Sequence, residues 1–79
     1  MADVTLSDGR ELTLNLFAVT HAEHIRMAKG ATTAEEDAVI LSRVVGMTPA
    51  DFDNLPQPDW RRVVVRYWEK SREPLADPN

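Results

Sequence analysis

Apolar and polar residues alternate near the N-terminus, which is the pattern of a β-strand with one buried face. Two short alternating runs flank Asp8 and Gly9. An Asp-Gly pair in this setting is the strongest short-range hairpin signal, because both residues tolerate the positive φ of a type I′ turn. We therefore predict a β-hairpin over residues 4–14, with Leu16 extending its second strand. The side chains expected on its apolar face are Val4, Leu6, Leu12 and Leu14.

After the hairpin the apolar spacing becomes helical. Thr20 and Thr33 each precede a glutamate by three residues, which is the capping-box pattern of a helix start. Gly30 and Gly46 suit helix ends, since glycine tolerates the left-handed conformation found there. The fold class expected is α+β, mainly α, with three to four helices after the hairpin and a long amphipathic helix last. The predicted helices span about residues 20–29, 34–45, 49–54 and 58–72.

Helical spacing also predicts which side chains face inward. The second predicted helix has a well-defined apolar face with Ile40 at its margin, whereas the first has only a thin apolar stripe. The side chains expected to face the core from the first three helices are Ala22, Ile25 and Ala28, with Met27 nearby, then Ala38, Leu41, Val44 and Val45, then Phe52 and Leu55.

The last predicted helix carries the largest apolar side chains of the chain. One aromatic side chain buries about 150–250 Å², so this helix is expected to supply the main surface of the core. Its apolar stripe recurs at helical spacing and comprises Trp60, Val63, Val64, Tyr67 and Trp68. The opposite face is charged and comprises Arg61, Arg62, Arg66, Glu69 and Lys70.

A length of 79 residues allows one small domain, expected over residues 1–72 and followed by a disordered tail over residues 73–79. A chain of this size buries only about 60–65% of the surface that its unfolded form exposes. It has no cysteine, which excludes disulfides and thiolate metal sites, so we expect a homo-oligomer to bury more surface. The sequence shows neither a membrane-spanning apolar run nor a signal-peptide pattern.

The formal net charge of -4 argues against general nucleic-acid binding. The charge is uneven, however. Residues 1–59 carry 4 basic and 10 acidic residues, whereas residues 60–79 carry 5 basic and 3 acidic residues. In the simpler interpretation the arginines of the last helix pair with acidic neighbours or stay solvated. In the alternative interpretation they contact DNA.

No pattern of catalytic, cofactor-binding or metal-binding residues emerges. His21 and His24 stand three residues apart, whereas the familiar metallo-hydrolase pattern places its histidines four apart with a glutamate between them. We interpret both as polar surface residues. Helix capping and the helix dipole explain the acidic run at residues 35–37, because adjacent residues on a helix do not face one another. The sequence therefore predicts a protein that is not an enzyme and uses neither cofactor nor metal.

The aromatic stripe of the last helix has two interpretations that the sequence leaves open. Either the whole stripe is core, or part of it stays exposed and binds a partner, since Trp, Tyr and Arg dominate interface hot spots. The residues expected to contact a partner under the second interpretation are Trp60, Val64, Tyr67 and Trp68, with Arg61, Arg62 and Arg66 as charges at the rim.

The order of elements resembles that of a known family. The hairpin contains Leu6-Ser7-Asp8-Gly9-Arg10, the third helix follows Val45-Gly46-Met47-Thr48-Pro49, and Asp59-Trp60 opens the last helix. This arrangement covers about residues 4–68 and is similar to the small tail assembly chaperones of long-tailed bacteriophages. Members of that family usually carry smaller aliphatic residues in the last helix, so the aromatic residues there depart from its pattern.

The resemblance implies a non-enzymatic protein that acts during virion morphogenesis. Such chaperones bind and solubilise the tape measure protein, which sets tail length, and help to recruit the tail tube protein. The implied location is the cytoplasm of the infected bacterial host, without incorporation into the mature virion. The alternatives are a small DNA-binding regulator that uses the basic helix, and a structural tail or head-completion protein.

Overall fold

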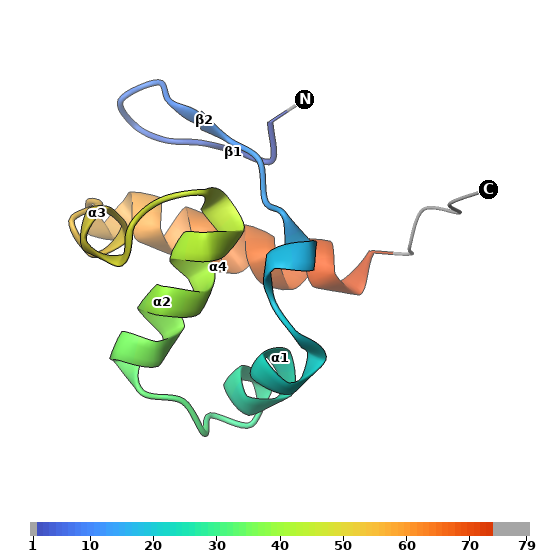
Figure 1. Cartoon of the computed structure of the whole chain (residues 1–79). Coiled ribbons are helices and arrows are strands. Elements are labelled where there is room, and N and C mark those ends of the chain that lie inside the picture. The colour runs from blue at the N-terminus through green and yellow to red at the C-terminus, as the bar shows by residue number, and fades with distance from the viewer. Residues whose placement is uncertain (1, 74–79) are drawn as a thin grey trace.

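The computed structural model describes residues 2–73, which form a hairpin followed by helices (Figure 1). The predicted fold class, α+β and mainly α, is confirmed. The strands are β1 (Val4–Thr5) and β2 (Glu11–Leu12), followed by a short 3-10 turn, η1 (Leu16–Ala18). The helices are α1 (His21–Ala28), α2 (Ala34–Val45), α3 (Pro49–Asp53) and α4 (Gln57–Arg72).

The predicted helix bounds lie within one residue of the observed bounds for each helix. The prediction of a disordered tail needs one correction at its first residue. Glu73 follows α4 directly, and its carboxylate lies 2.9 Å from the guanidinium of Arg66. Glu73 therefore belongs to the folded domain, and residues 74–79 lie outside the described residues.

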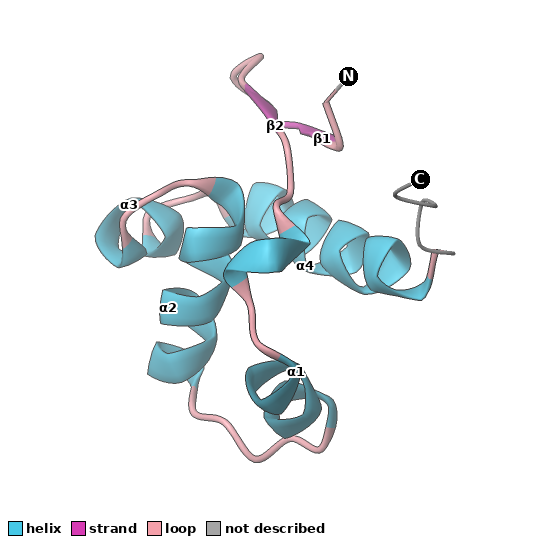
Figure 2. Cartoon of the chain, turned by 45° about the vertical axis from the view of Figure 1, so that its right-hand side comes forward, coloured by secondary structure: helices cyan, strands magenta, loops and turns pink. Residues whose placement is uncertain are grey.

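Helix α4 is the element on which the others are arranged (Figures 1 and 2). The hairpin lies on one side of α4 and α1 lies on the opposite side in both views. Helix α2 runs steeply across α4, and α3 lies beside the first turns of α4. The first strand, β1, therefore contacts the last helix, α4.

The predicted hairpin forms, but its turn and therefore its register differ from those of a two-residue turn at Asp8 and Gly9. Val4 pairs with Leu12 in an antiparallel ladder. The carbonyl of Leu6 accepts a hydrogen bond from the Gly9 N–H at 3.0 Å, while the Leu6 N–H donates to the Arg10 carbonyl at 2.8 Å. Among the described residues, positive φ occurs only at glycines, with 93° at Gly9. The type I′ turn is therefore wrong, because it needs positive φ at two residues, and the turn is a longer one closed by a glycine bulge.

Asp8 explains this choice of turn. Its carboxylate accepts hydrogen bonds from the backbone N–H of Arg10 at 3.0 Å and from the Arg10 guanidinium at 2.7 Å. Leu16 does not extend the second strand as predicted, because the chain turns into η1 just before it. The Asn15 side chain accepts a hydrogen bond from the Phe17 N–H, and the Asn15 N–H donates to the Val44 carbonyl of α2.

The core lies between the hairpin, α2 and α4. All four apolar hairpin side chains are buried, as predicted, and so are the predicted inward residues of α2 and α3. Ile40 is not marginal, since only 4% of it is exposed. The prediction for α1 is wrong for Ala22 and Ala28, which are exposed, whereas Ile25 and Met27 are half-buried. No residue of α1 is completely buried. Helix α1 therefore contributes little to the core.

A buried carboxylate ties the hairpin to the first turn of α4. Asp59 is only 2% exposed. Its two oxygens accept hydrogen bonds from the backbone N–H of Ser7 at 3.0 Å and from the Ser7 hydroxyl at 2.7 Å. The guanidinium of Arg62 completes the set at 3.1 Å. Three donors thus satisfy the two carboxylate oxygens of Asp59, so hydrogen bonds offset the free-energy cost of burying its charge.

A second tie joins the start of the hairpin to the end of α4. The ammonium of Lys70 lies 2.8 Å from the carboxylate of Asp3 and 2.7 Å from the carbonyl of Leu14. The Leu14 N–H donates to the same carboxylate at 2.8 Å. Burial alone raises the pKa of Asp3, but the hydrogen bonds and the charges of Lys70 and Arg66 outweigh it, so the pKa lies below its ordinary value of 3.8.

Candidate protein-binding site

The structure divides the seven predicted partner-binding residues between two faces of α4. Trp60, Val64 and Trp68 are half-buried and pack against the core, and Tyr67 is only 1% exposed. Tyr67 is therefore a core residue rather than a contact residue, which corrects its prediction. The other three residues lie on the outward face, where Arg61 and Arg62 are exposed and Arg66 is partly exposed.

An aromatic cluster forms where α1 meets the second half of α4. The Nδ1 atom of His24 lies 2.7 Å from the hydroxyl of Tyr67. The His24 ring also lies 5.1 Å from the Trp68 ring between centroids, and Tyr67 meets Trp68 edge-on at 5.1 Å. Burial raises the pKa of the Tyr67 hydroxyl, and the charge of Glu23 raises it further. His24 is thus part of the packed structure, whereas His21 is exposed as predicted.

Helix α1 is attached to its neighbours mainly by polar contacts at its edges. Glu23 pairs with Arg43 of α2, and Arg26 pairs with Glu36 at 2.7 Å. Both pairs are substantially exposed, and such pairs contribute only about 0–1 kcal/mol each. Together with the absence of any completely buried residue, this makes α1 the least firmly held helix among the described residues.

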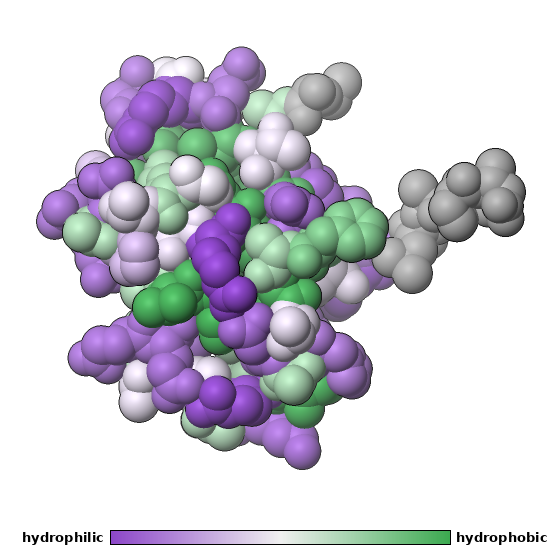
Figure 3. Space-filling model, in the orientation of Figure 1, coloured by the Kyte–Doolittle hydropathy of each residue, from purple (hydrophilic) through white to green (hydrophobic). Residues whose placement is uncertain are grey.

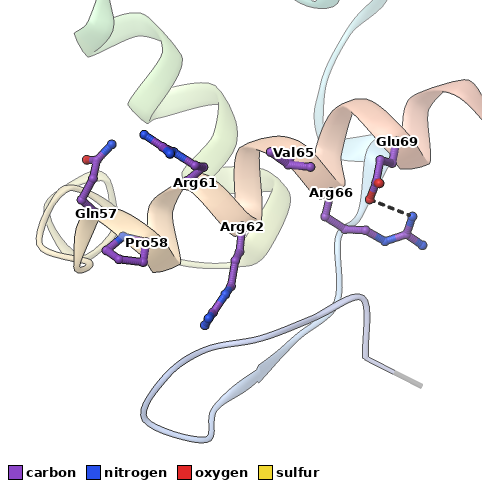
Figure 4. A pocket seen from close by; sticks show the side chains of 7 residues that line it. All are labelled: Gln57, Pro58, Arg61, Arg62, Val65, Arg66 and Glu69. Atoms are coloured by element: carbon purple, nitrogen blue, oxygen red, sulfur yellow. Dashed lines mark ion pairs between the residues drawn. The ribbon is translucent and has the colours of Figure 1, made fainter.

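An open groove of about 560 Å³ runs along the outward face of α4 (Figure 4). Three arginines and Glu69 line it, and Val65 lies between them with 51% of its surface exposed. Arg62 forms an ion pair with Asp59. Arg66 forms ion pairs with Asp3 and Glu73 and, at 3.9 Å, with Glu69. The interpretation that these arginines pair internally is therefore confirmed for Arg62 and Arg66. Arg61 has no ion pair within residues 2–73.

The acidic run of α2 serves the roles predicted for capping. Glu36 completes a capping box with Thr33, and Thr20 forms the same motif with Glu23 at the start of α1. Asp37 accepts a hydrogen bond from the Thr32 hydroxyl at 2.5 Å. Glu35 extends into solvent without an ion pair among the described residues. Within residues 2–73 there is also no group of three His, Asp or Glu side chains able to hold a metal ion.

Sequence reasoning missed two features of this surface. Phe17 is completely exposed, because η1 turns its neighbours Leu16 and Ala18 toward the core and leaves Phe17 in solvent. The partly buried hydrogen bond between Asp59 and Ser7 joins residues 52 positions apart, and no local pattern indicates it. Figure 3 shows one face of the molecule, on which hydrophobic patches lie beside strongly hydrophilic ones.

Comparisons of the chain with protein-family models, with curated proteins and with solved structures found no match. Among the residues that the structure describes, no helix has both the length and the apolar character to cross a membrane. The class that the described structure itself defines is a small, mainly helical α+β domain with a basic groove on α4 and an aromatic cluster beneath α1.

Proposed function

We propose that this chain is a tail assembly chaperone of a long-tailed bacteriophage that binds the tape measure protein and helps to recruit the tail tube protein. The resemblance in the order of elements supports the family. The observation that carries a binding role is the construction of the aromatic cluster, in which the weakly held helix α1 packs, through His24, against the half-buried Trp68 of α4.

Binding through this cluster follows from its energetics. Val64 and Trp68 retain partly exposed apolar surface, and α1, which contacts Trp68, contributes no completely buried side chain. An apolar helix of a client that packs there gains about 25 cal/mol for each Å² of apolar surface that it removes from water. Helix-in-groove recognition of this kind uses residues spaced like Trp60, Val64 and Trp68. The client therefore needs an amphipathic helix whose apolar face the client does not bury by itself.

The proposal keeps the expected location and chemistry. The chaperone acts in the cytoplasm of the infected host, is absent from the finished particle, and performs no covalent reaction. The engagement of Arg62 and Arg66 in ion pairs with the domain gives the alternative of a DNA-binding regulator no support from α4. A structural tail or head-completion protein differs from a chaperone in one measurable respect, because it is found in purified particles.

Co-expression with the tape measure protein encoded downstream tests the proposal. A soluble complex, with a client that is insoluble when expressed alone, is the expected result. Trp68→Ala is expected to weaken the complex at least tenfold, as truncation of an aromatic hot spot does. Met47→Ala is the matched control, because Met47 is also half-buried and packed on the core but lies outside α4.

Circular dichroism of both variants separates loss of binding from loss of fold. Trp68→Ala with native helicity and weakened binding supports the aromatic cluster as the contact. A variant that binds like the wild type removes the cluster from the mechanism. A client that is soluble alone and forms no complex refutes the chaperone function, and binding to DNA that falls steeply with salt establishes the regulator instead.

A further inference from the structure

The outward faces of α2 and α4 carry matching patterns of exposed residues. On α2 the exposed stripe contains Glu35, Val39 and Arg43, spaced four residues apart. On α4 it contains Arg61, Val65 and Glu69 with the same spacing. Residues four apart lie on one side of a helix, so each set of three forms a stripe. From its N-terminal end, the stripe of α2 reads acidic, valine, basic, and the stripe of α4 reads basic, valine, acidic.

Both valines lie in grooves whose charges are opposite. Val65 lies in the groove of α4, whose charged residues are three arginines and one glutamate, a net charge of +2. Val39 lies in a groove of about 290 Å³ between α1 and α2, whose charged residues are three glutamates and one arginine, a net charge of −2. Val39 is 47% exposed and Val65 is 51% exposed, and with Phe17 they are the large apolar side chains exposed among residues 2–73.

We propose that a second copy of this chain occupies the groove of α4, with the outward stripe of its α2 packed parallel to α4. A single offset of 26 positions then aligns all three pairs. Arg61 meets Glu35, Val65 meets Val39, and Glu69 meets Arg43. The same offset places Arg62 opposite Glu36. The contact thus has an apolar centre with oppositely charged pairs on both sides, which is the usual organisation of a helix–helix interface.

The order of charges selects the direction of the two helices. In an antiparallel arrangement centred on the two valines, Arg61 meets Arg43 and Glu69 meets Glu35. Like charges placed opposite one another disfavour that arrangement, which makes the parallel one specific. Arg61 and Glu35 matter most for this choice, because neither has an ion pair within its own described chain to give up.

The net charges of the grooves select unlike faces over like faces. Two α4 stripes in an antiparallel, two-fold arrangement also pair Arg61 with Glu69, so the stripe pattern alone permits a symmetric dimer. That dimer brings two grooves of charge +2 together, however, and the equivalent α2 dimer brings two grooves of charge −2 together. The heterologous contact joins +2 to −2, and long-range attraction therefore favours it.

Because the contact joins two different faces, every complex keeps an unoccupied α4 groove at one end and an unoccupied α2 stripe at the other. Each copy offers α4 to one neighbour and α2 to another, so association continues until it closes into a ring or extends as a filament. Because α2 runs steeply across α4, each added copy is strongly rotated relative to the last (Figure 1). This contact deepens the expected self-association and does not depend on client binding, so either idea can fail without the other.

Sedimentation velocity of the purified chain alone, over a range of concentrations, tests the contact. The wild type is expected to associate with concentration. Arg61→Glu and Glu35→Arg are each expected to weaken association at least about tenfold, because each places like charges together. Glu11→Arg makes the same chemical change on an exposed residue of β2 and is expected to have no effect. Val65→Asp is a further disrupting variant, and Val65 is exposed enough for the fold to survive.

Recombination of the two charge reversals decides the geometry. Mixing the Arg61→Glu and Glu35→Arg chains restores association under the proposal, as does placing both changes in one chain. Restoration of Arg61→Glu by Glu69→Arg instead overturns the proposed parallel contact, because that swap places like charges together in it and suits the symmetric α4 dimer or an antiparallel contact with α2. A wild type that stays monomeric at every concentration, or association that none of these variants changes, also overturns it. Circular dichroism confirms that each variant is folded.

Discussion

Replacement of Asp59 by alanine is expected to be among the most damaging single changes in this chain. The substitution removes three charge-assisted hydrogen bonds from a carboxylate that is 2% exposed. Hydrogen bonds to charged groups contribute about 1.5–3 kcal/mol each, but Ser7 and Arg62 lie near the surface and regain water partners. The net loss is therefore expected to be about 2–4 kcal/mol rather than the full sum.

This loss is large relative to the whole stability of such a domain. At about 0.05–0.15 kcal/mol per residue, a chain of this length has about 4–12 kcal/mol of unfolding free energy. A loss of about 2–4 kcal/mol is expected to lower Tm by about 8–32 °C in a domain of this size. The hairpin is the part that separates from α4, because Asp59 is its tie to the first turn of that helix.

Urea unfolding followed by tryptophan fluorescence measures the effect, since both tryptophans lie on α4. Asp53→Ala is the matched control, because Asp53 is an exposed aspartate in α3 with no side-chain hydrogen bond among the described residues, and it is expected to change stability by less than about 0.5 kcal/mol. Ser7→Ala removes only the hydroxyl donor and is expected to cost about 1 kcal/mol. A double-mutant cycle with no coupling between Asp59 and Ser7, or an Asp59→Ala variant as stable as Asp53→Ala, refutes the reasoning.

Three further changes test other parts of the structure. The pKa of Asp3 is lowered because hydrogen bonds and ion pairs outweigh burial, so its stabilising contribution is present above pH 3.8 and is lost as the pH falls through the lower, folded-state pKa. Asp3→Asn should cost about 1–3 kcal/mol at pH 7. The difference from wild type in urea unfolding should narrow as the pH falls below 3.8. Gly46→Ala should lower stability by about 1 kcal/mol in thermal unfolding, because φ is 75° there and no atom clashes with an added Cβ. Tyr67→Phe removes the bond to His24, costs about 0.5–1.5 kcal/mol, and should speed amide exchange in α1 more than in α2; equal exchange in both helices contradicts the weak attachment of α1.

The local elements of this fold could be predicted because their signals lie within three or four residues. Thr33 and Glu36 form the expected capping box, and Gly46 adopts the expected left-handed conformation at the end of α2. Pro49 begins α3 after the cap Thr48. Each of these features satisfies backbone groups close by in sequence, so the composition of a short window is enough to predict them.

The arrangement of the candidate site could not be predicted in the same way. Helical spacing placed Trp60, Val64 and Trp68 on one face, but it did not show that Tyr67 is covered by His24, which is 43 residues away. Ile40 is buried because α1 and α2 meet beside it, whereas the sequence placed it at a margin. The prediction of a type I′ turn at Gly9 was wrong for a different reason, since the local hydrogen bond from the Arg10 N–H to the Asp8 carboxylate competes with that geometry.

The ties between the hairpin and α4 have a consequence for synthesis of the chain on the ribosome. Asp3 is joined to Lys70 across 67 positions, and Ser7 to Asp59 across 52. While the last helix is still inside the exit tunnel, the hairpin has made none of these contacts, and its apolar face has no surface on which to pack. The domain therefore completes its fold only after α4 has left the exit tunnel, and the nascent hairpin is exposed to other chains until then.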